Sequence, residues 1–282
     1  MNNQQTWTEE IKSNNSLFSI NVKEIWHYRD LLIMLVKRDF ITFYKQTILG
    51  PIWFFVQPLL TTITYLVLFG QIAKISTDGA PQVAFYLSGI TIWNYFSEVL
   101  TKTSTVFKDN SNLFGKVYFP RLIMPVAIVV SGLMKFAIQF SLFIVVVIYF
   151  AFAEKSIHPN LWILLTPFLV LLMACFALGM GMIFSSLTTK YKDLVFLLTF
   201  GIQLFMYATP VVYPSSAIPE KYVWLLSINP LTGIFECFRY AYLGTGSFKT
   251  MNLWISTIEI VIVLFLGVLI YNKVEKNFMD TV

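Results

Sequence analysis

Charged residues are scarce in this sequence: Asp, Glu, Lys and Arg make up 12% of its 282 residues, whereas soluble domains carry about 25%. Hydrophobic residues make up 57%, and the segment from Gln46 to Ala73 contains no charged residue. About 20 apolar residues in a helix cross the hydrocarbon core of a bilayer. The composition therefore excludes a soluble monomer and indicates a membrane protein.

Cysteine and histidine are also rare, with two of each. Cys175 and Cys237 lack the paired spacing of a metal site, so we expect both to pack as apolar side chains. His27 and His158 are isolated, with no second histidine at ligand spacing from either, and the nucleophile motif G-x-S-x-G is absent. We therefore predict neither a metal site nor a catalytic residue.

The sequence lacks the Walker A motif that holds the phosphates of ATP. Its one Gly-Lys pair, Gly115-Lys116, is followed by Val117 and lacks the upstream glycine of that motif. We expect this chain to bind no cofactor and not to hydrolyse ATP itself.

Charge-poor segments long enough to cross a bilayer recur along the chain. They occupy residues 51–73, 82–101, 122–152, 161–187, 195–213 and 252–271. We predict an all-α integral membrane protein with six transmembrane helices in a domain of residues 51–273. Residues 1–22 and 274–282 are predicted to be cytoplasmic tails, and no cleaved signal peptide is expected.

The basic residues indicate the orientation, because Lys and Arg in short flanking segments stay in the cytoplasm. With both termini inside, fourteen of the 20 Lys and Arg residues lie on the cytoplasmic side and five on the other, and Lys135 lies within the third segment. The net charge of +5 reflects this asymmetry and an attraction to anionic lipids. It does not indicate nucleic-acid binding.

Residues 23–45 have the periodicity of an amphipathic helix, with apolar residues on one side and charged residues on the other. A spanning helix here would place Lys37, Arg38 and Asp39 near the bilayer centre, at a cost of about 3 kcal/mol each. We therefore predict an in-plane interface helix within residues 23–50.

Two loops have unusual composition. The predicted cytoplasmic loop at 102–121 is short, basic and aromatic, and it is either a solvated turn or a knob that docks on a soluble partner. At the other side, Pro210 and Pro214 interrupt the fifth predicted helix. The apolar residues that follow predict two short helices, broken at Asn229-Pro230, that dip back into the membrane. We expect the segment 214–250 to form an external gate.

Aromatic residues are abundant, with 27 Phe, 14 Tyr and 7 Trp. Trp and Tyr gather at the two membrane interfaces of any membrane protein. Several aromatic residues are expected at other depths, where their rings would line a conduit and stack weakly on the sugar rings of a polymer. These channel-lining candidates are Trp53, Phe54, Phe55, Tyr65, Phe69, Tyr207 and Tyr213.

Charged residues inside the predicted spans are candidates for function. Glu98 and Lys102 are four residues apart, in the order that favours an ion pair on a helix. Lys135 and Glu259 either meet across the third and sixth spans or face the conduit.

Four ordered motifs resemble the pattern of the type-two ABC exporter permeases that move O-antigen, teichoic acid and capsular polysaccharide. The first contains Arg38-Asp39-Phe40, Tyr44-Lys45, Leu49-Gly50, Trp53 and Pro58; the second Asn110, Leu113, Lys116, Phe119, Pro120 and Pro125; the third Lys192-Asp193, Gln203, Thr209-Pro210-Val211 and Tyr213-Pro214; and the fourth Asn229-Pro230, Arg239 and Gly244. The resemblance runs from about residue 25 to the C terminus. It departs from the family at Lys192, where Arg is common.

This resemblance implies a homodimer in the cytoplasmic (inner) membrane of a bacterium, bound to two copies of a separate ATPase subunit that carries ATP and Mg²⁺. It implies a conduit between the first and fifth spans of both subunits and a lipid-linked polysaccharide as substrate, with O-antigen foremost. The residues that it implies in coupling to the ATPase are Arg38, Asp39, Tyr44, Lys45, Asn110, Leu113, Lys116 and Phe119. Those that it implies in the external gate are Pro210, Pro214, Asn229, Pro230 and Arg239.

Two alternatives differ in class. A related permease for a drug or small lipid usually lacks the short aromatic motif of the first span and often carries a large external domain. A membrane-embedded acyltransferase or polymerase acting on glycans requires a cluster of His, Asp or Ser residues, which the sequence does not contain.

Overall fold

The computed structural model describes residues 26–45, 50–114, 116, 119–191, 193–246 and 248–277. Within these residues all the regular secondary structure is helical and there is no strand, which confirms the predicted all-α class. The predicted N-terminal tail at 1–22 and the position Lys192 lie outside the described residues.

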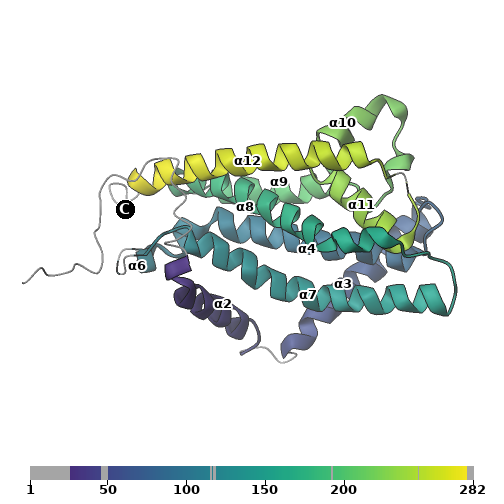
Figure 1. Cartoon of the computed structure of the whole chain (residues 1–282), viewed down its shortest axis with the longest axis horizontal. Helices are drawn as coiled ribbons and strands as arrows, with labels where there is room; N and C mark the ends of the chain where they lie inside the picture. Colours follow the sequence, from purple (N-terminus) through teal and green to yellow (C-terminus); the bar gives the residue numbers. More distant parts are fainter. Residues whose placement is uncertain are drawn as a thin grey trace, which may run out of the picture.

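Four long helices run side by side along the long axis of the molecule (Figure 1). They are α4 (Gln82–Ser104), α7 (Ile123–Phe152), α8 (Thr166–Lys190) and α12 (Thr250–Asn277). Helix α8 packs between α4 and α12, and α4 also packs against α7. A 3-10 turn at Leu161–Leu165 precedes α8. The bundle thus has the packing order α12, α8, α4, α7.

Two further helices flank α4. Helix α3 (Trp53–Tyr65) follows a 3-10 turn at Gly50–Ile52, continues into π-helical turns at Leu66–Ile72, and crosses the bundle obliquely (Figure 1). Helix α9 (Leu194–Ala208) contacts both α4 and α8. Helix α4 therefore lies between α3 and α9 and contacts both.

Short helices lie at the two ends of the bundle (Figure 1). Helices α5 (Val106–Asp109) and α6 (Ser111–Phe114) lie at the end where α12 finishes, and α2 (Arg29–Tyr44) packs against α7. The opposite end carries α10 (Val223–Ile228) and α11 (Thr232–Leu243), together with 3-10 turns at Ser215–Ala217 and Glu220–Tyr222. Helices α10 and α11 lie on either side of Asn229-Pro230, where the sequence predicts two short helices.

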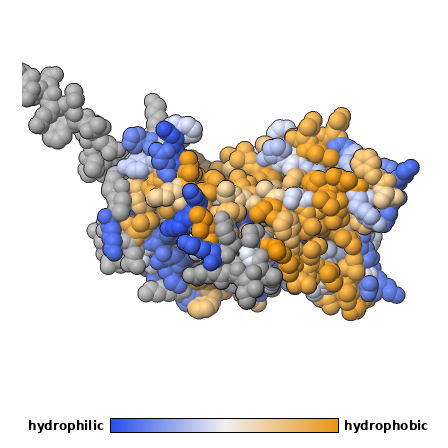
Figure 2. All heavy atoms as spheres, turned by 90° about the horizontal axis from the view of Figure 1, so that it is seen from below, coloured by the Kyte–Doolittle hydropathy of each residue, from blue (hydrophilic) through white to orange (hydrophobic). Residues whose placement is uncertain are grey.

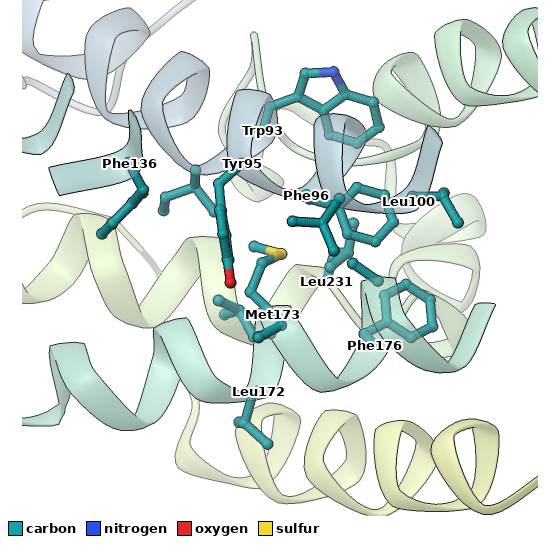
Figure 3. Close-up of a cluster of buried hydrophobic side chains, with 14 of the residues drawn as sticks. Trp93, Tyr95, Phe96, Leu100, Phe136, Leu172, Met173, Phe176 and Leu231 are labelled. Atoms are coloured by element: carbon teal, nitrogen blue, oxygen red, sulfur yellow. The ribbon is translucent and has the colours of Figure 1, made fainter. Parts of the chain in front are cut away.

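The core is built from aromatic contacts between α4 and its neighbours (Figure 3). Phe96 of α4 stacks on Phe176 of α8 with ring centroids 5.4 Å apart, and Tyr95 contacts Phe136 of α7 at 5.5 Å. Most of α4 is buried against other helices of the protein. Polar residues are therefore tolerated in this helix, whereas they would be costly in contact with lipid.

Among the described residues, four helical stretches are long and apolar enough to cross a membrane: Trp53–Ile72, Ile123–Phe152, Leu161–Lys190 and Thr250–Val274. Helix α4 is long enough but more polar, and α9 is apolar but contains 15 residues. At 1.5 Å per residue α9 is about 22 Å long, against a core of about 30 Å. It ends at Ala208, before the end of the charge-poor segment at residue 213, as expected because Pro210 cannot continue the helix.

The surface agrees with a membrane location. Figure 2 shows hydrophobic side chains over a broad band of one face and hydrophilic side chains at both ends. Leu60, Phe196 and Ile262, on α3, α9 and α12, are large apolar side chains that remain exposed. Such an apolar surface is typical of contact with lipid or with a second subunit.

Helix α2 carries its buried residues on one side, as the periodicity predicts. Leu35 and Val36 are buried, in the helix that packs on α7, whereas Lys37 and Arg38 are exposed. Its orientation relative to a membrane stays a prediction.

Helices α8 and α12 approach each other at two glycines. A Cβ atom on Gly267 would collide with the carbonyl oxygen of Gly179 and lie 2.9 Å from its Cα. A Cβ atom on Gly179 would lie 2.8 Å from the Cα of Leu264. Small residues that allow such an approach are typical of helix packing inside membranes.

Candidate functional site

One arginine joins three segments at the α10–α11 end of the bundle. Arg239 of α11 is 7% exposed, and the centroid of the Phe85 ring of α4 lies 3.7 Å from its guanidinium carbon. The guanidinium donates hydrogen bonds to the carbonyl oxygens of Pro210 at 2.7 Å, Tyr213 at 3.2 Å and Val211. Its planar set of five donors suits several acceptors at once. These carbonyl oxygens follow the end of α9 and no longer accept helical hydrogen bonds, so the guanidinium supplies their donors instead.

Asn229 binds the same end of α9 from the turn between α10 and α11. Its Nδ2 atom donates to the carbonyl oxygen of Ala208 at 3.1 Å and to Oγ1 of Thr209 at 2.9 Å. Its Oδ1 atom accepts from the backbone N–H of Leu231 at 3.0 Å. The third and fourth sequence motifs are therefore in direct contact.

The other predicted gate residues lie in the same region. Pro214 and Arg239 line one small cavity, and Pro230 is in the turn between α10 and α11. Oγ of Ser216 donates to Oδ1 of Asp78 at 2.6 Å, which joins this segment to the loop between α3 and α4. The five gate candidates thus form one connected structure.

The sequence analysis did not identify the residues of α4 that contact Arg239 and the gate candidates. Oγ of Ser88 lies 3.5 Å from Nε of Arg239. A Cβ atom on Gly89 would collide with the carbonyl oxygen of Val211 and lie 2.9 Å from Nη2 of Arg239. The adjacent small residues Ser88 and Gly89, among bulky neighbours, are the sequence signal for this close approach.

A cleft between α3, α4 and α9 brings together two channel-lining candidates. It has a volume of about 540 Å³ and is lined by aromatic, polar and aliphatic residues: Tyr65, Trp93, Ser97, Thr101, Thr199, Ile202, Gln203, Met206 and Tyr207. Oη of Tyr65 lies 3.6 Å from Sδ of Met206, and Tyr207 is 57% exposed. We name this space the aromatic cleft.

Two more candidates pack beside the aromatic cleft. The ring of Phe69 packs edge-on against Tyr65 at a centroid distance of 5.4 Å. Tyr213 donates a hydrogen bond from its hydroxyl to the carbonyl oxygen of Tyr207 at 3.0 Å. Four of the seven candidates therefore belong to one aromatic region.

The remaining three candidates lie in the first turn of α3. Trp53 and Phe54 line a second cavity, of about 370 Å³, between α3, α4 and α7. Trp53 is 47% exposed and Phe54 is buried. Phe55 is half-buried and is not part of the lining of either space. Whether any of the seven contacts substrate stays a prediction.

Charged residues cluster in this second cavity. Oε1 of Glu98 accepts from Nζ of Lys102 at 2.7 Å and from Nζ of Lys135. The pair of Glu98 and Lys102 on α4 is confirmed. Lys135 pairs with Glu98 and not with Glu259, because α7 packs on α4 whereas α12 packs on α8. Oε2 of Glu259 is buried and has no hydrogen-bond partner among the described residues.

A third cavity, of about 670 Å³, lies between α2, α7 and the end of α4. Its lining contains three coupling candidates, Arg38, Asp39 and Asn110. Arg38 and Asp39 form an ion pair with Nη2 and Oδ1 2.8 Å apart. The first and second sequence motifs therefore meet at this cavity.

The other coupling candidates differ in exposure. Lys45 and Lys116 are exposed, Leu113 is half-buried, and the side chain of Tyr44 lies outside the described residues. Phe119 is 5% exposed, so its ring is not part of an exposed aromatic knob.

Phe119 belongs instead to a row of aromatic rings in contact. Its centroid lies 5.6 Å from that of Phe114, which lies 5.8 Å from that of Phe107. Phe107 stacks on Tyr271 of α12 at 4.7 Å. The row connects the loop before α7 to the last helix of the bundle.

The sequence matches the ABC-2 type transporter family over residues 30–243, which is most of the chain. The chain belongs to the ABC-2 type transporter family. This ABC-2 transporter chain is similar to an O-antigen export system permease protein of Klebsiella pneumoniae, with 28% identity over 89% of this chain and 94% of the relative. A permease of the same description from Myxococcus xanthus is 29% identical over 77% of this chain and 82% of the relative. The polysialic acid transport protein KpsM of Escherichia coli is 22% identical over 88% of this chain and 94% of the relative.

Proposed function

We propose that this ABC-2 transporter chain is the permease subunit of an ATP-driven exporter that moves a lipid-linked polysaccharide across the bacterial inner membrane. The similarity to O-antigen export permeases, which extends over 89% of the chain, carries this proposal. It makes O-antigen the first candidate substrate, with teichoic acid and capsular polysaccharide as related alternatives. The aromatic cleft supports it, since rings stack on sugars without strong hydrogen bonds.

The conduit requires a second copy of the chain. Phe196 and Tyr207 on α9 and Leu60 on α3 are exposed apolar or aromatic side chains. A homodimer that pairs these faces would enclose the two aromatic clefts. In this arrangement each subunit has six crossings, with α4 and the short α9 sheltered by protein, and both termini lie in the cytoplasm.

Force reaches the permease from a separate ATPase subunit, present in two copies, that holds ATP and Mg²⁺. The ATPase subunit acts on the permease beside the third cavity, between α2, α7 and the end of α4. Residues of the first and second sequence motifs, which the resemblance implies in coupling, meet at this cavity. The row of rings from Phe119 to Tyr271 then carries the displacement into the bundle. At the other end, Arg239 and Asn229 hold the gate segment.

Deletion of the gene from its host tests the transport proposal. The expected result is loss of the surface polysaccharide together with accumulation of the lipid-linked polymer inside the cell, because synthesis continues without export. Polymer analysis of surface and membrane fractions measures both quantities, and expression of the wild-type gene should restore the surface polymer. A deletion strain with normal surface polysaccharide would contradict the proposal.

The change Lys116→Glu should separate ATP hydrolysis from export. Lys116 is exposed in the proposed coupling loop, so charge reversal should weaken its contact with the ATPase without disturbing the core. We expect the variant to retain ATP hydrolysis and dimer assembly, with surface polymer reduced at least about tenfold. Lys155→Glu is the matched control, because Lys155 is exposed in the loop after α7, at the opposite end and outside the predicted gate segment. Undiminished export with Lys116→Glu would argue against coupling through this loop.

A further inference from the structure

The second cavity, between α3, α4 and α7, has more positive than negative charge in its lining. The residues that line it are Trp53, Phe54, Gln57, Asn94, Ser97, Glu98, Thr101, Lys102, Lys135 and Gln139. Among these described residues are two ammonium groups and one carboxylate, an excess of one positive charge. We call this space the charged cavity.

The charges are held in a partly buried position. The side chains of Lys135, Glu98 and Lys102 are 10%, 25% and 37% exposed. One oxygen of Glu98 accepts hydrogen bonds from both lysines, and Nζ of Lys135 also lies 5.6 Å from the centroid of the Phe54 ring. A charged group in apolar surroundings is costly and marks a functional position by default. The excess charge therefore favours an anionic ligand in the cavity.

The charged cavity lies between the other two spaces. Lys102 also lines the cavity beside α2, and Ser97 and Thr101 also line the aromatic cleft. A ligand that enters beside α2 therefore meets the charged cavity before the aromatic cleft. A charged headgroup bound here would leave its attached polymer next to the aromatic cleft.

The walls of the charged cavity are suited to an amphipathic ligand. Trp53 is 47% exposed and belongs to the apolar α3, and Phe54 forms a buried wall beside Lys135. Asn94 donates to Gln139 at 3.3 Å, so the polar side of the cavity has hydrogen-bonding groups besides the charges. A phosphate group matches this side, because it offers several acceptor oxygens to lysine.

We propose that the charged cavity binds the phosphate group of the lipid anchor of the substrate, with Lys135 and Lys102 as its cationic partners. This inference rests on the proposed export of a lipid-linked polysaccharide. Glu98 holds the two ammonium groups in place and competes with the phosphate for their charge.

Equilibrium binding of radiolabelled farnesyl diphosphate tests the inference, with the full-length chain in nanodiscs of neutral phosphatidylcholine. Lys135→Gln should weaken binding at least about tenfold, because one charge-assisted hydrogen bond is lost. Lys135→Arg should retain binding, and Glu98→Gln should strengthen it about tenfold, since the competing carboxylate is removed. A purely structural ion pair predicts no such strengthening. Lys273→Gln is the matched control, because Lys273 is exposed on α12 away from the cavity.

Competition experiments identify the source of the phosphate. Farnesol and inorganic diphosphate should each compete at least about tenfold more weakly than unlabelled farnesyl diphosphate, since each lacks half of the ligand. Equal competition by inorganic diphosphate, or full displacement by phosphatidylglycerol in the nanodisc, would overturn the assignment to the lipid anchor. Unchanged binding in both Lys135→Gln and Glu98→Gln would overturn the site itself. Neither result would affect the deletion phenotype, which tests export separately.

Discussion

Replacement of Arg239 by Gln should unfold the gate segment and abolish export. The guanidinium supplies hydrogen bonds to the carbonyl oxygens of Pro210, Val211 and Tyr213. A buried acceptor that loses its donor costs about 1–3 kcal/mol, so the loss of all three donors should cost at least about 3 kcal/mol. We expect the melting temperature in detergent to fall by about 10 °C and surface polymer to disappear. Scanning fluorimetry and polymer analysis measure the two effects.

Two further variants distinguish geometry from charge at this position. Arg239→Lys keeps the positive charge, but an ammonium group cannot reach all three carbonyl oxygens, so we expect only partial recovery. Lys249→Gln removes one positive charge from an exposed position near the start of α12, and it should have little effect. If Arg239→Lys and the wild type melted at the same temperature, charge alone would explain the role of Arg239.

A single methyl group on Gly267 should disrupt the contact between α8 and α12. In Gly267→Ala the new Cβ atom meets the backbone of Gly179, which cannot move aside as a flexible side chain does. Overpacking of this kind costs about 1–3 kcal/mol, and Gly267→Val should exceed that range. We expect a fall in melting temperature that grows from Ala to Val, with lower amounts of protein in the membrane.

Gly201 provides the matched control for this substitution. It lies inside α9, and a Cβ atom there would meet nothing within 4 Å. Gly201→Ala should leave the melting temperature unchanged or raise it, because alanine favours the helix over glycine by up to about 1 kcal/mol. Equal melting temperatures for Gly267→Ala and Gly201→Ala would show that the two helices are not in close contact at Gly267.

Helix positions follow largely from local sequence. The segments 122–152 and 252–271, predicted from their lack of charge, correspond to α7 and α12. The fifth helix ends before its charge-poor segment does, as the position of Pro210 predicts, because proline cannot continue the helical hydrogen bonding. The lack of charge also places residues 82–101 among the predicted spans, although α4 is more polar than the other long helices and protein surrounds most of it.

The candidate sites were predicted less completely. The motifs identify Arg239 and Asn229, but not the carbonyl groups and the α4 surface that they bind. Phe119 was expected on an exposed loop, but its ring is buried in the row of rings. The physical reason is that aromatic side chains pack against one another when the fold brings them together. The sequence analysis expected Lys135 either to meet Glu259 or to face the conduit. The pairing with Glu259 is wrong, because α7 packs on α4 and places Lys135 beside Glu98.

The sequence by itself determined the all-helical class, the membrane location and the family, because each depends on patterns within short segments of the chain. Only the tertiary structure decided that Arg239 holds the proline segment, that Glu98 joins two lysines, and that three cavities adjoin one another along α4. These features depend on residues far apart in the sequence, and helix packing alone brings their side chains within hydrogen-bonding distance.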